Sequence, residues 1–302
     1  MKETVTLPVS NARRLAVCLA VAASLAQAAS GADILINDAK SGPESLTVAP
    51  GGVLIVGSAS TPFVYRVRAG ATTAEKFIDA SAEGPGTFFL GMLADASTNT
   101  LWTCQLTPVQ GNPAQRHSAL RSFTLDTGAP KIRWDLPGDV SVCNDFAIGP
   151  DKALYVTDTG NAKIFKLPAG KSAADLFLED RAALAGIDGI TFLNGTLYVN
   201  NVRTNKVYRV PVDGAGKAAP AVEIVLDQPV KGPDGMRAAN GKLLLAENGA
   251  GKISAITVTG DKGVVTVLKE GLTTPTAVEP AGDTIWIAER GTGKAVSIPM
   301  PK

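Results

Sequence analysis

Histidine and cysteine are scarce in this sequence, and their scarcity limits the chemistry it can support. The 302 residues include one histidine, His117, and three cysteines. Zinc sites are built mainly from several histidine and cysteine ligands, so a zinc centre is disfavoured. Aromatic residues make up only 5% of the chain, the net charge is +1, and no basic run stands out. We therefore expect no nucleic-acid-binding surface.

Long apolar runs are also missing. The N-terminal run from Leu15 to Leu25 is too short to span a bilayer. Two arginines precede it and an Ala-Gln-Ala cleavage site follows, an order typical of a secretory signal peptide. The alternative is an ordinary buried helix. We expect residues 1–28 to be removed and residues 29–302 to form one domain. The mature protein would be periplasmic or secreted, monomeric and free of the membrane.

Glycine and proline are abundant instead, with 31 and 19 residues, which favours many short strands joined by turns. The clearest stretch is PDGMRAANGKLLLAENGAGKISAI, from Pro233 to Ile256, where Asn-Gly separates two apolar runs. This is a strong hairpin signal. The same order of strands and turns recurs six times. The first apolar residue of the second strand marks each copy: Leu54, Leu101, Leu154, Leu197, Leu243 and Ile285.

The spacings between these copies are 47, 53, 43, 46 and 42 residues. Repeats of roughly 40–50 residues with several strands each are typical of propeller blades. Six copies predict an all-β, six-bladed β-propeller. The last copy shows only three strands before the chain ends. We therefore expect the strand at residues 33–37 to close the last blade, which would leave no open sheet edge between the two ends.

Two cysteines remain after the predicted signal peptide, Cys104 and Cys143. They fall on the same face of neighbouring predicted blades, and such a pair in an exported protein is typically a disulfide. The alternative is two unpaired buried thiols. Residues 107–118 link two strands of the second copy and contain His117. This segment is either a lid over the propeller mouth or a solvated loop.

The start of each first strand should face the central channel. The aligned residues there are Glu44, Gly91, Asn144, Asp188, Asp234 and Thr276. Four of them, Glu44, Asn144, Asp188 and Asp234, carry a carboxylate or an amide. Three carboxylates without a basic partner would repel one another. A hard divalent cation would remove that repulsion. Calcium is the first choice because it tolerates irregular geometry, with magnesium, manganese and zinc as alternatives. The competing interpretation is that these side chains only cap turns.

A second polar ring lies four residues past each marker residue. Its members are Ser58, Gln105, Asp158, Asn201, Glu247 and Glu289. The ends of the second strands lie on the same face as the starts of the first strands, so this ring could contact a substrate. We assign substrate binding to Asp158 and Glu247, together with Asn144. The alternative interpretation is that the ring consists of polar turn residues at the blade tips.

Three short motifs resemble the gluconolactonase and regucalcin family of six-bladed propellers. They begin at Glu44 (Glu-Ser), Asn144 (Asn-Asp) and Pro233 (Pro-Asp-Gly-Met). The resemblance covers nearly all of the chain after the signal peptide. It implies a divalent metal held by Glu44 and Asp234, with Asp188 where the family usually has Asn. Asn144 matches a substrate-side Asn.

The resemblance also implies an activity, because members of this family open cyclic esters of sugars or hydrolyse other esters and phosphoesters. Val142 stands where the family's sugar lactonases have Arg. We expect a metal-dependent hydrolase of a small lactone or ester, with Asp234 as general base. A non-catalytic ligand- or protein-binding propeller is the alternative. A propeller like strictosidine synthase or a dehydrogenase is a third, weaker interpretation.

Overall fold

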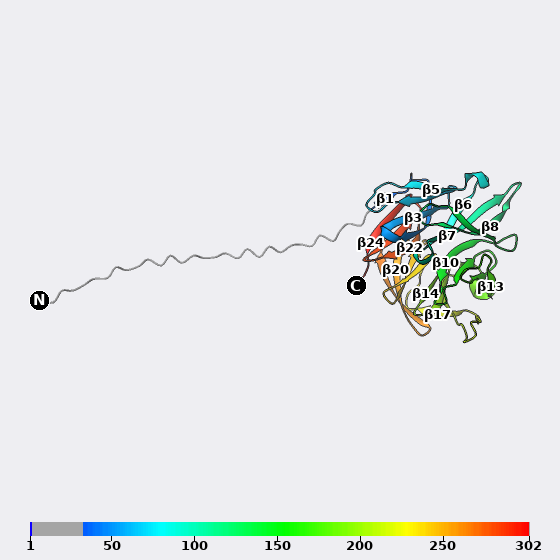
Figure 1. Ribbon diagram of the computed structural model, residues 1–302. Helices are drawn as coiled ribbons and strands as arrows, with labels where there is room; N and C mark the ends of the chain where they lie inside the picture. The colour runs from blue at the N-terminus through cyan, green and yellow to red at the C-terminus, as the bar shows by residue number, and fades with distance from the viewer. Residues whose placement is uncertain (2–32, 302) are drawn as a thin grey trace. The chain divides into compact units, whose positions relative to one another are not determined.

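The computed structural model describes residue 1 and residues 33–301, so the predicted signal peptide lies outside the described residues (Figure 1). The regular secondary structure of residues 33–301 is almost entirely β-strand. The one α-helix in this range is α1 (Arg181–Leu184), which Asp180 caps by accepting from the backbone N–H groups of Ala182 and Ala183. No helix in the described part has the length and apolarity to cross a membrane.

Four of the sheets contain four antiparallel strands each, and in three of them the strands follow the order of the chain. The first consists of β2 (Pro43–Ala49), β3 (Val53–Ser58), β4 (Phe63–Val67) and β5 (Glu75–Asp79). The second consists of β6 (Phe88–Asp95), β7 (Thr100–Val109), β8 (Asn112–Thr124) and β9 (Pro130–Asp135). The third consists of β10 (Cys143–Ile148), β11 (Leu154–Asp158), β12 (Lys163–Leu167) and β13 (Asp175–Glu179).

The fourth of these sheets joins the two ends of the described chain. It consists of β22 (Pro275–Ala281), β23 (Thr284–Glu289), β24 (Lys294–Pro299) and β1 (Asp33–Leu35). Ile34 of β1 lies opposite Ala295 of β24 in an antiparallel register. The predicted closure by the N-terminal strand is therefore confirmed, with a strand of three residues instead of five. Pairing with β1 covers the edge that β24 would otherwise expose.

The remaining sheet has eight strands and departs from the prediction of six separate blades. One half contains β14 (Ile187–Leu193), β15 (Thr196–Asn201), β16 (Lys206–Val210) and β17 (Val222–Leu226). The other half contains β18 (Pro233–Ala239), β19 (Lys242–Glu247), β20 (Lys252–Thr259) and β21 (Lys262–Lys269). Two parallel pairs, Val225 with Lys262 and Leu226 with Gly263, join the halves. Gly263 permits this contact, since a Cβ there would lie 2.7 Å from the Leu226 side chain.

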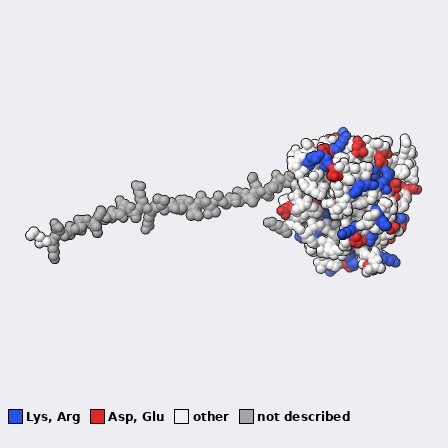
Figure 2. Space-filling model, in the orientation of Figure 1, with Lys and Arg blue, Asp and Glu red and all other residues white. Residues whose placement is uncertain are grey.

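The first strand of every repeat packs against the first strand of the next. The order is β2, β6, β10, β14, β18, β22 and back to β2. The chain therefore has an all-β, propeller-like fold in which six inner strands close a ring. On the face seen in Figure 2, acidic and basic side chains are interspersed without a continuous patch of one sign.

Residues 107–118 form neither a lid nor a loop. They extend the hairpin of β7 and β8, and His117 lies opposite Thr107 in the ladder. The reason is that backbone pairing continues almost to the tip, where a turn with Gly111 at φ +82° reverses the chain. His117 is exposed and belongs to this hairpin.

Cys104 of β7 and Cys143 of β10 form a disulfide with a Cα–Cα distance of 5.3 Å. The bond joins neighbouring sheets and is buried among apolar side chains, including Leu120 and Phe146. The predicted pairing is confirmed.

We expect reduction of this disulfide to lower the free energy of unfolding. Closing a loop of 39 residues removes conformational entropy from the unfolded chain worth about 4 kcal/mol. Denaturant titration with and without reductant measures the loss, and the Cys104→Ala/Cys143→Ala double variant shows whether reductant acts elsewhere. Equal stability of the oxidised and reduced forms would contradict the expectation.

A buried ionic network occupies the axis of the ring. Arg237 of β18 donates to Asp145 of β10 at 2.8 and 3.1 Å, and to Glu279 of β22 at 3.0 Å. It also donates to the carbonyl oxygen of Met92 on β6 at 3.2 Å. Thr47 of β2 donates to Glu279 at 3.1 Å. The network therefore joins five of the six inner strands.

The sixth inner strand, β14, contacts the same network, because the backbone N–H of Ile190 donates to Asp145 at 3.4 Å. Burial disfavours the charge on Arg237, but Asp145 and Glu279 together raise its pKa above the ordinary value. Arg237 therefore stays charged and holds the ring by charge-assisted hydrogen bonds.

Replacing Arg237 by Ala should destabilise the protein by about 3–5 kcal/mol, because two buried carboxylates lose their partner. Chemical denaturation provides the measurement. The matched control is Arg209→Ala, which removes an arginine from the exposed pair with Asp261 and should change stability little. Adding Asp145→Asn and Glu279→Gln to Arg237→Ala should restore part of the loss. If Arg237→Ala costs no more than the control, the network does not hold the ring.

Candidate active site

All six residues that the repeat alignment placed at the channel line one small cavity. Its volume is about 10 Å³, enough for a single water-sized centre. The six residues are Glu44, Gly91, Asn144, Asp188, Asp234 and Thr276. Each comes from a different inner strand, so equivalent positions in the sequence are equivalent positions in space.

A β-bulge re-aims the inner strands at this point. The pairing of β2 with β3 shifts between Pro43 and Leu46, and that of β10 with β11 shifts between Cys143 and Phe146. The other four inner strands have the same irregularity at the same place. A bulge inserts an extra residue into one strand and changes the direction of its side chains. The six bulges account for the convergence of the side chains on the axis.

Glycine at three bulges allows the inner strands to approach closely. A Cβ on Gly91 would lie 2.2 Å from the carbonyl oxygen of Asn144, and one on Gly235 would lie 2.7 Å from that of Thr276. A Cβ on Gly189 would lie 2.7 Å from the carbonyl oxygen of Asp234. Because a side chain cannot fit there, glycine is needed for backbone contact around the ring.

The four oxygen-bearing residues are held by hydrogen bonds. Asn144 Nδ2 donates to Asp188 at 3.1 Å and to Thr159 at 3.0 Å. Asn248 Nδ2 donates to Asp234 at 3.0 Å. The Asp188 and Asp234 carboxyl groups line the same small cavity. This part of the site is a close pair of carboxyls fixed by amides on two sides.

Glu44 differs from the other acids because it has a basic partner. Arg290 follows β23, and its Nη1 lies 2.8 Å from Glu44 Oε2. The Arg290 side chain is 41% exposed, whereas the Glu44 side chain is 11% exposed. The expectation of a purely acidic cluster was therefore wrong. Arg290 follows Glu289 in the turn after β23, where the repeat alignment gives no reason to expect a charge aimed at the channel.

The electrostatics of the cluster favour neutral carboxyls. Burial raises the pKa of Asp188 well above its ordinary value of 3.8, and the charges of Glu44 and Asp145 raise it further. Burial, Asp188 and Glu44 raise the pKa of Asp234 in the same way. Burial also raises the pKa of Glu44, although Arg290 opposes the shift. A positive charge placed among these groups would stabilise their ionised forms.

The oxygen ligands of the site suit a hard cation, but the side chains that carry them are not close enough together to form a ready-made metal site. Three carboxyl groups and one amide are the oxygen ligands that calcium and magnesium prefer. Among the described residues, no group of three or more His, Cys, Asp or Glu side chains is arranged closely enough to be a ready-made metal site. One oxygen of Glu44 is bonded to Arg290 instead. Cation binding would require the two side chains to separate.

The second polar ring has a structural role that needs no ligand. Asp158 accepts hydrogen bonds from the backbone N–H groups of Val142, Gly160 and Asn161. Glu247 accepts from the backbone N–H of Lys231 and from the Ser254 hydroxyl.

Ser58, Gln105, Asn201 and Glu289 are also buried and hydrogen-bonded. Five of the six ring members, all except Gln105, tie a turn or an entry loop to the end of the second strand. Substrate binding by Asp158 and Glu247 stays a prediction, and their bonds favour the turn-residue alternative.

The comparisons with known proteins find no match in sequence but several in structure. No protein-family model matches the chain, and no curated protein matches it. A protein described as a gluconolactonase aligns with a TM-score of 0.65 and 16% identity, over 90% of this chain and 92% of its own. The luciferin-regenerating enzyme aligns with a TM-score of 0.63 and 13% identity, over 89% and 95%.

Virginiamycin B lyase from Staphylococcus aureus aligns with a TM-score of 0.62 and 17% identity, over 89% of this chain and 98% of its own. Identities this low show the fold alone, and the fold is that of an all-β, propeller-type protein. The three neighbours are named for different activities, so the fold does not choose the reaction. The residues of the site have to carry that conclusion.

The raised pKa values predict how the stability of the cation-free protein depends on pH. Carboxyls with a higher pKa in the folded state contribute stability that is complete below their ordinary pKa and is lost as pH rises through the folded value. We expect the melting temperature in chelator to fall as pH rises above about 4. Asp188→Asn should flatten this dependence and raise the melting temperature near neutral pH.

The control for this experiment is Asp175→Asn, which changes an exposed aspartate on β13. Its pH dependence should follow that of the unaltered protein. If the melting temperature of Asp188→Asn depended on pH in the same way as that of the unaltered protein, repulsion among the carboxyl groups would not limit stability.

Proposed function

We propose that this protein is an exported hydrolase of lactones or related esters that uses a divalent cation at the mouth of the central channel. The observation that carries the proposal is the convergence of three carboxyl groups and one amide from four inner strands on one cavity. The ligands would be Glu44, Asp188, Asp234 and Asn144. Calcium is the first candidate because the arrangement is irregular.

The proposal includes a six-bladed propeller. The eight-stranded sheet counts as two four-stranded blades, because only two residue pairs join β17 to β21 whereas each half pairs along its length. Six inner strands close the ring. The contact between β17 and β21 then joins the outer strands of blades four and five, and the ring of six inner strands is unaffected by it.

The electrostatics support a cation at this position. Asp188 and Asp234 are 8% and 9% exposed. Burial raises the pKa of both carboxyls, the charge of Glu44 raises both further, and the charge of Asp188 also raises that of Asp234. Without a counter-charge, protonation removes this repulsion. A divalent cation would replace the protons, so its affinity should increase with pH.

The site residues have distinct roles in the proposed reaction. A bound cation would polarise the ester carbonyl and lower the pKa of a water molecule. Asp234 would accept the proton of the attacking water as general base, held in place by Asn248. Asn144 is oriented by its bonds to Thr159 and Asp188 through Nδ2, and its carbonyl oxygen would contact the cation or the substrate.

Arg290 would contribute a positive charge at the rim. Its side chain is 41% exposed, so it can leave Glu44 and donate to an oxygen of the ester. Val142, the position at which sugar lactonases of the resembling family have Arg, is half-buried, and its N–H donates to Asp158. The proposed substrate class is therefore lactones and esters in general, without a commitment to sugars.

Export rests on the predicted signal peptide and on the disulfide between Cys104 and Cys143. Disulfides persist in the periplasm and outside the cell, where no thiol-reducing system acts on them. The fold and the disulfide together fit a protein that works in an oxidising compartment.

A non-catalytic binding propeller is the second candidate. The ion pair between Glu44 and Arg290 favours it, since the pair neutralises part of the acidic cluster without a metal. Such a protein would bind a small molecule at the channel mouth and release it unchanged.

Asp234→Ala tests the hydrolase proposal. We expect this variant to lose calcium binding and to lower hydrolysis of the best lactone or aryl ester by at least about 100-fold, because it removes a ligand and the general base. Calorimetric titration with calcium and a hydrolysis assay provide the two measurements. Glu270→Ala, at an exposed glutamate, is the control and should change neither.

Two outcomes would decide against the proposal. If Asp234→Ala keeps both calcium affinity and activity, the site is elsewhere. If the unaltered protein hydrolyses no member of a lactone and ester panel with calcium, magnesium or manganese, but is stabilised by one of those compounds, the binding candidate is correct.

A further inference from the structure

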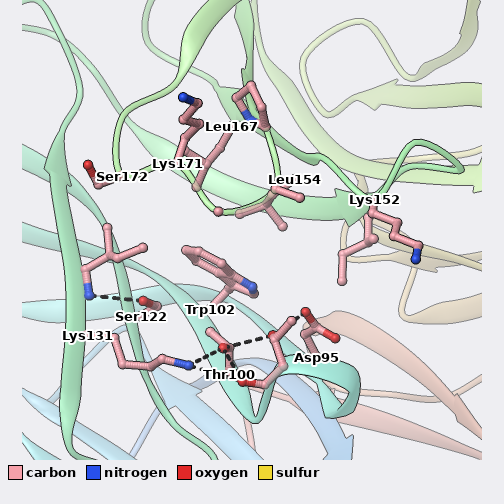
Figure 3. A pocket seen from close by; sticks show the side chains of 16 residues that line it. Asp95, Thr100, Trp102, Ser122, Lys131, Lys152, Leu154, Leu167, Lys171 and Ser172 are labelled. Atoms are coloured by element: carbon pink, nitrogen blue, oxygen red, sulfur yellow. Dashed lines mark hydrogen bonds between the residues drawn. The ribbon is translucent and has the colours of Figure 1, made fainter.

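A second cavity lies at the other end of the strands, away from the candidate active site. Asn144, which lines the active-site cavity, is at the start of β10, whereas Ile148, which lines the second cavity, is at its end. The cavity has a volume of about 270 Å³ and lies between the second and third sheets (Figure 3). We call it the inter-sheet cavity.

The floor of the inter-sheet cavity is apolar and flat. Trp102 of β7 lies between the strand that carries Lys131 and the ends of β11 and β12, as Figure 3 shows. Leu154 and Leu167 face it from the third sheet, and both are buried. An indole bordered by two leucines suits the face of an aromatic ring.

The polar groups of the cavity are mostly donors. Asp95 accepts from Ser97 and Thr98, and Lys131 donates to Thr100 at 2.6 Å and to two backbone carbonyl oxygens. These two charged side chains are therefore satisfied by the protein. They leave no free acidic group to attract a cation.

Three other donors have no partner in residues 33–301. The exposed amino groups of Lys152 and Lys171 form no ion pair or side-chain hydrogen bond there, and neither does the indole N–H of Trp102. Lys152 comes from the turn between β10 and β11, and Lys171 comes from the turn after β12. Two positive charges and one N–H donor thus border an apolar floor.

We propose that the inter-sheet cavity binds a small organic anion with a flat, apolar ring body and a carboxylate. The ring would lie against Trp102. Lys152 and Lys171 lie on opposite sides of the cavity in Figure 3, and their positive charges at its rim would attract the carboxylate, which would pair with one of them. The volume is slightly below the range of about 300–1,000 Å³ found for drug-sized ligands, which selects a molecule of one or two rings. The excess of donors over acceptors selects an anion over a cation or a neutral base.

Naphthalene-1-carboxylate is a suitable probe, and its neutral carboxamide is the matched control ligand. Isothermal titration calorimetry should show that the carboxylate binds about tenfold more tightly than the amide, with an affinity that falls as salt is added. The Lys152→Glu/Lys171→Glu variant should lose about tenfold in affinity for the carboxylate. Lys217→Glu, an exposed lysine outside the cavity, should not.

Further variants separate this site from the active site and from loss of folding. Trp102→Phe keeps an aromatic floor and should weaken binding less than Trp102→Ala. Asp234→Ala should bind the carboxylate as the unaltered protein does. Equal affinity for carboxylate and carboxamide, unchanged affinity in the double lysine variant, or no binding at millimolar probe would each overturn the proposal. Matching melting temperatures of the lysine variants and the unaltered protein show that a change in affinity reflects the cavity.

Discussion

The buried arginine at the axis is the interaction on which the rest of the structure depends. A ring of inner strands brings six sets of backbone and side-chain polar groups to a narrow channel, where water has little access. Arg237, on β18, bonds three other inner strands directly, and its partners Asp145 and Glu279 reach the remaining two. A buried charge is tolerated only when it is paired and hydrogen-bonded, and here every member has a partner.

The candidate active site lies directly beside this network and shares its construction. Asn144 and Asp145 are neighbours within the bulge of β10, and both line the cavity of the candidate site. Asn144 bonds to Asp188, whereas Asp145 bonds to Arg237. The charge of Asp145 also contributes to the raised pKa of Asp188. The scaffold therefore does more than position the acids, because its own charge affects their protonation.

The two cavities near the ends of β10 differ in chemistry. The candidate active site has carboxyl groups around a small cavity at the start of the strand, whereas the inter-sheet cavity near its end has amino groups around an indole. The proposed ligands differ accordingly: a divalent cation at the first site and an organic anion at the second.

The repeat with its Asn-Gly hairpins determined the inner-strand order, the closure by the N-terminal strand and the six positions that meet at the channel, because period, turn chemistry and alternation are local properties of the chain. The pairing of Cys104 with Cys143 followed from the same alignment.

The tertiary structure alone decided that Arg290 pairs with Glu44, that Arg237 fills the axis and that β17 joins β21. These contacts link residues far apart in the sequence or on different blades, and no periodic pattern encodes them. The second polar ring shows the same limit: alignment located Asp158 and Glu247, but only the packed turns revealed that their oxygens bind backbone N–H groups.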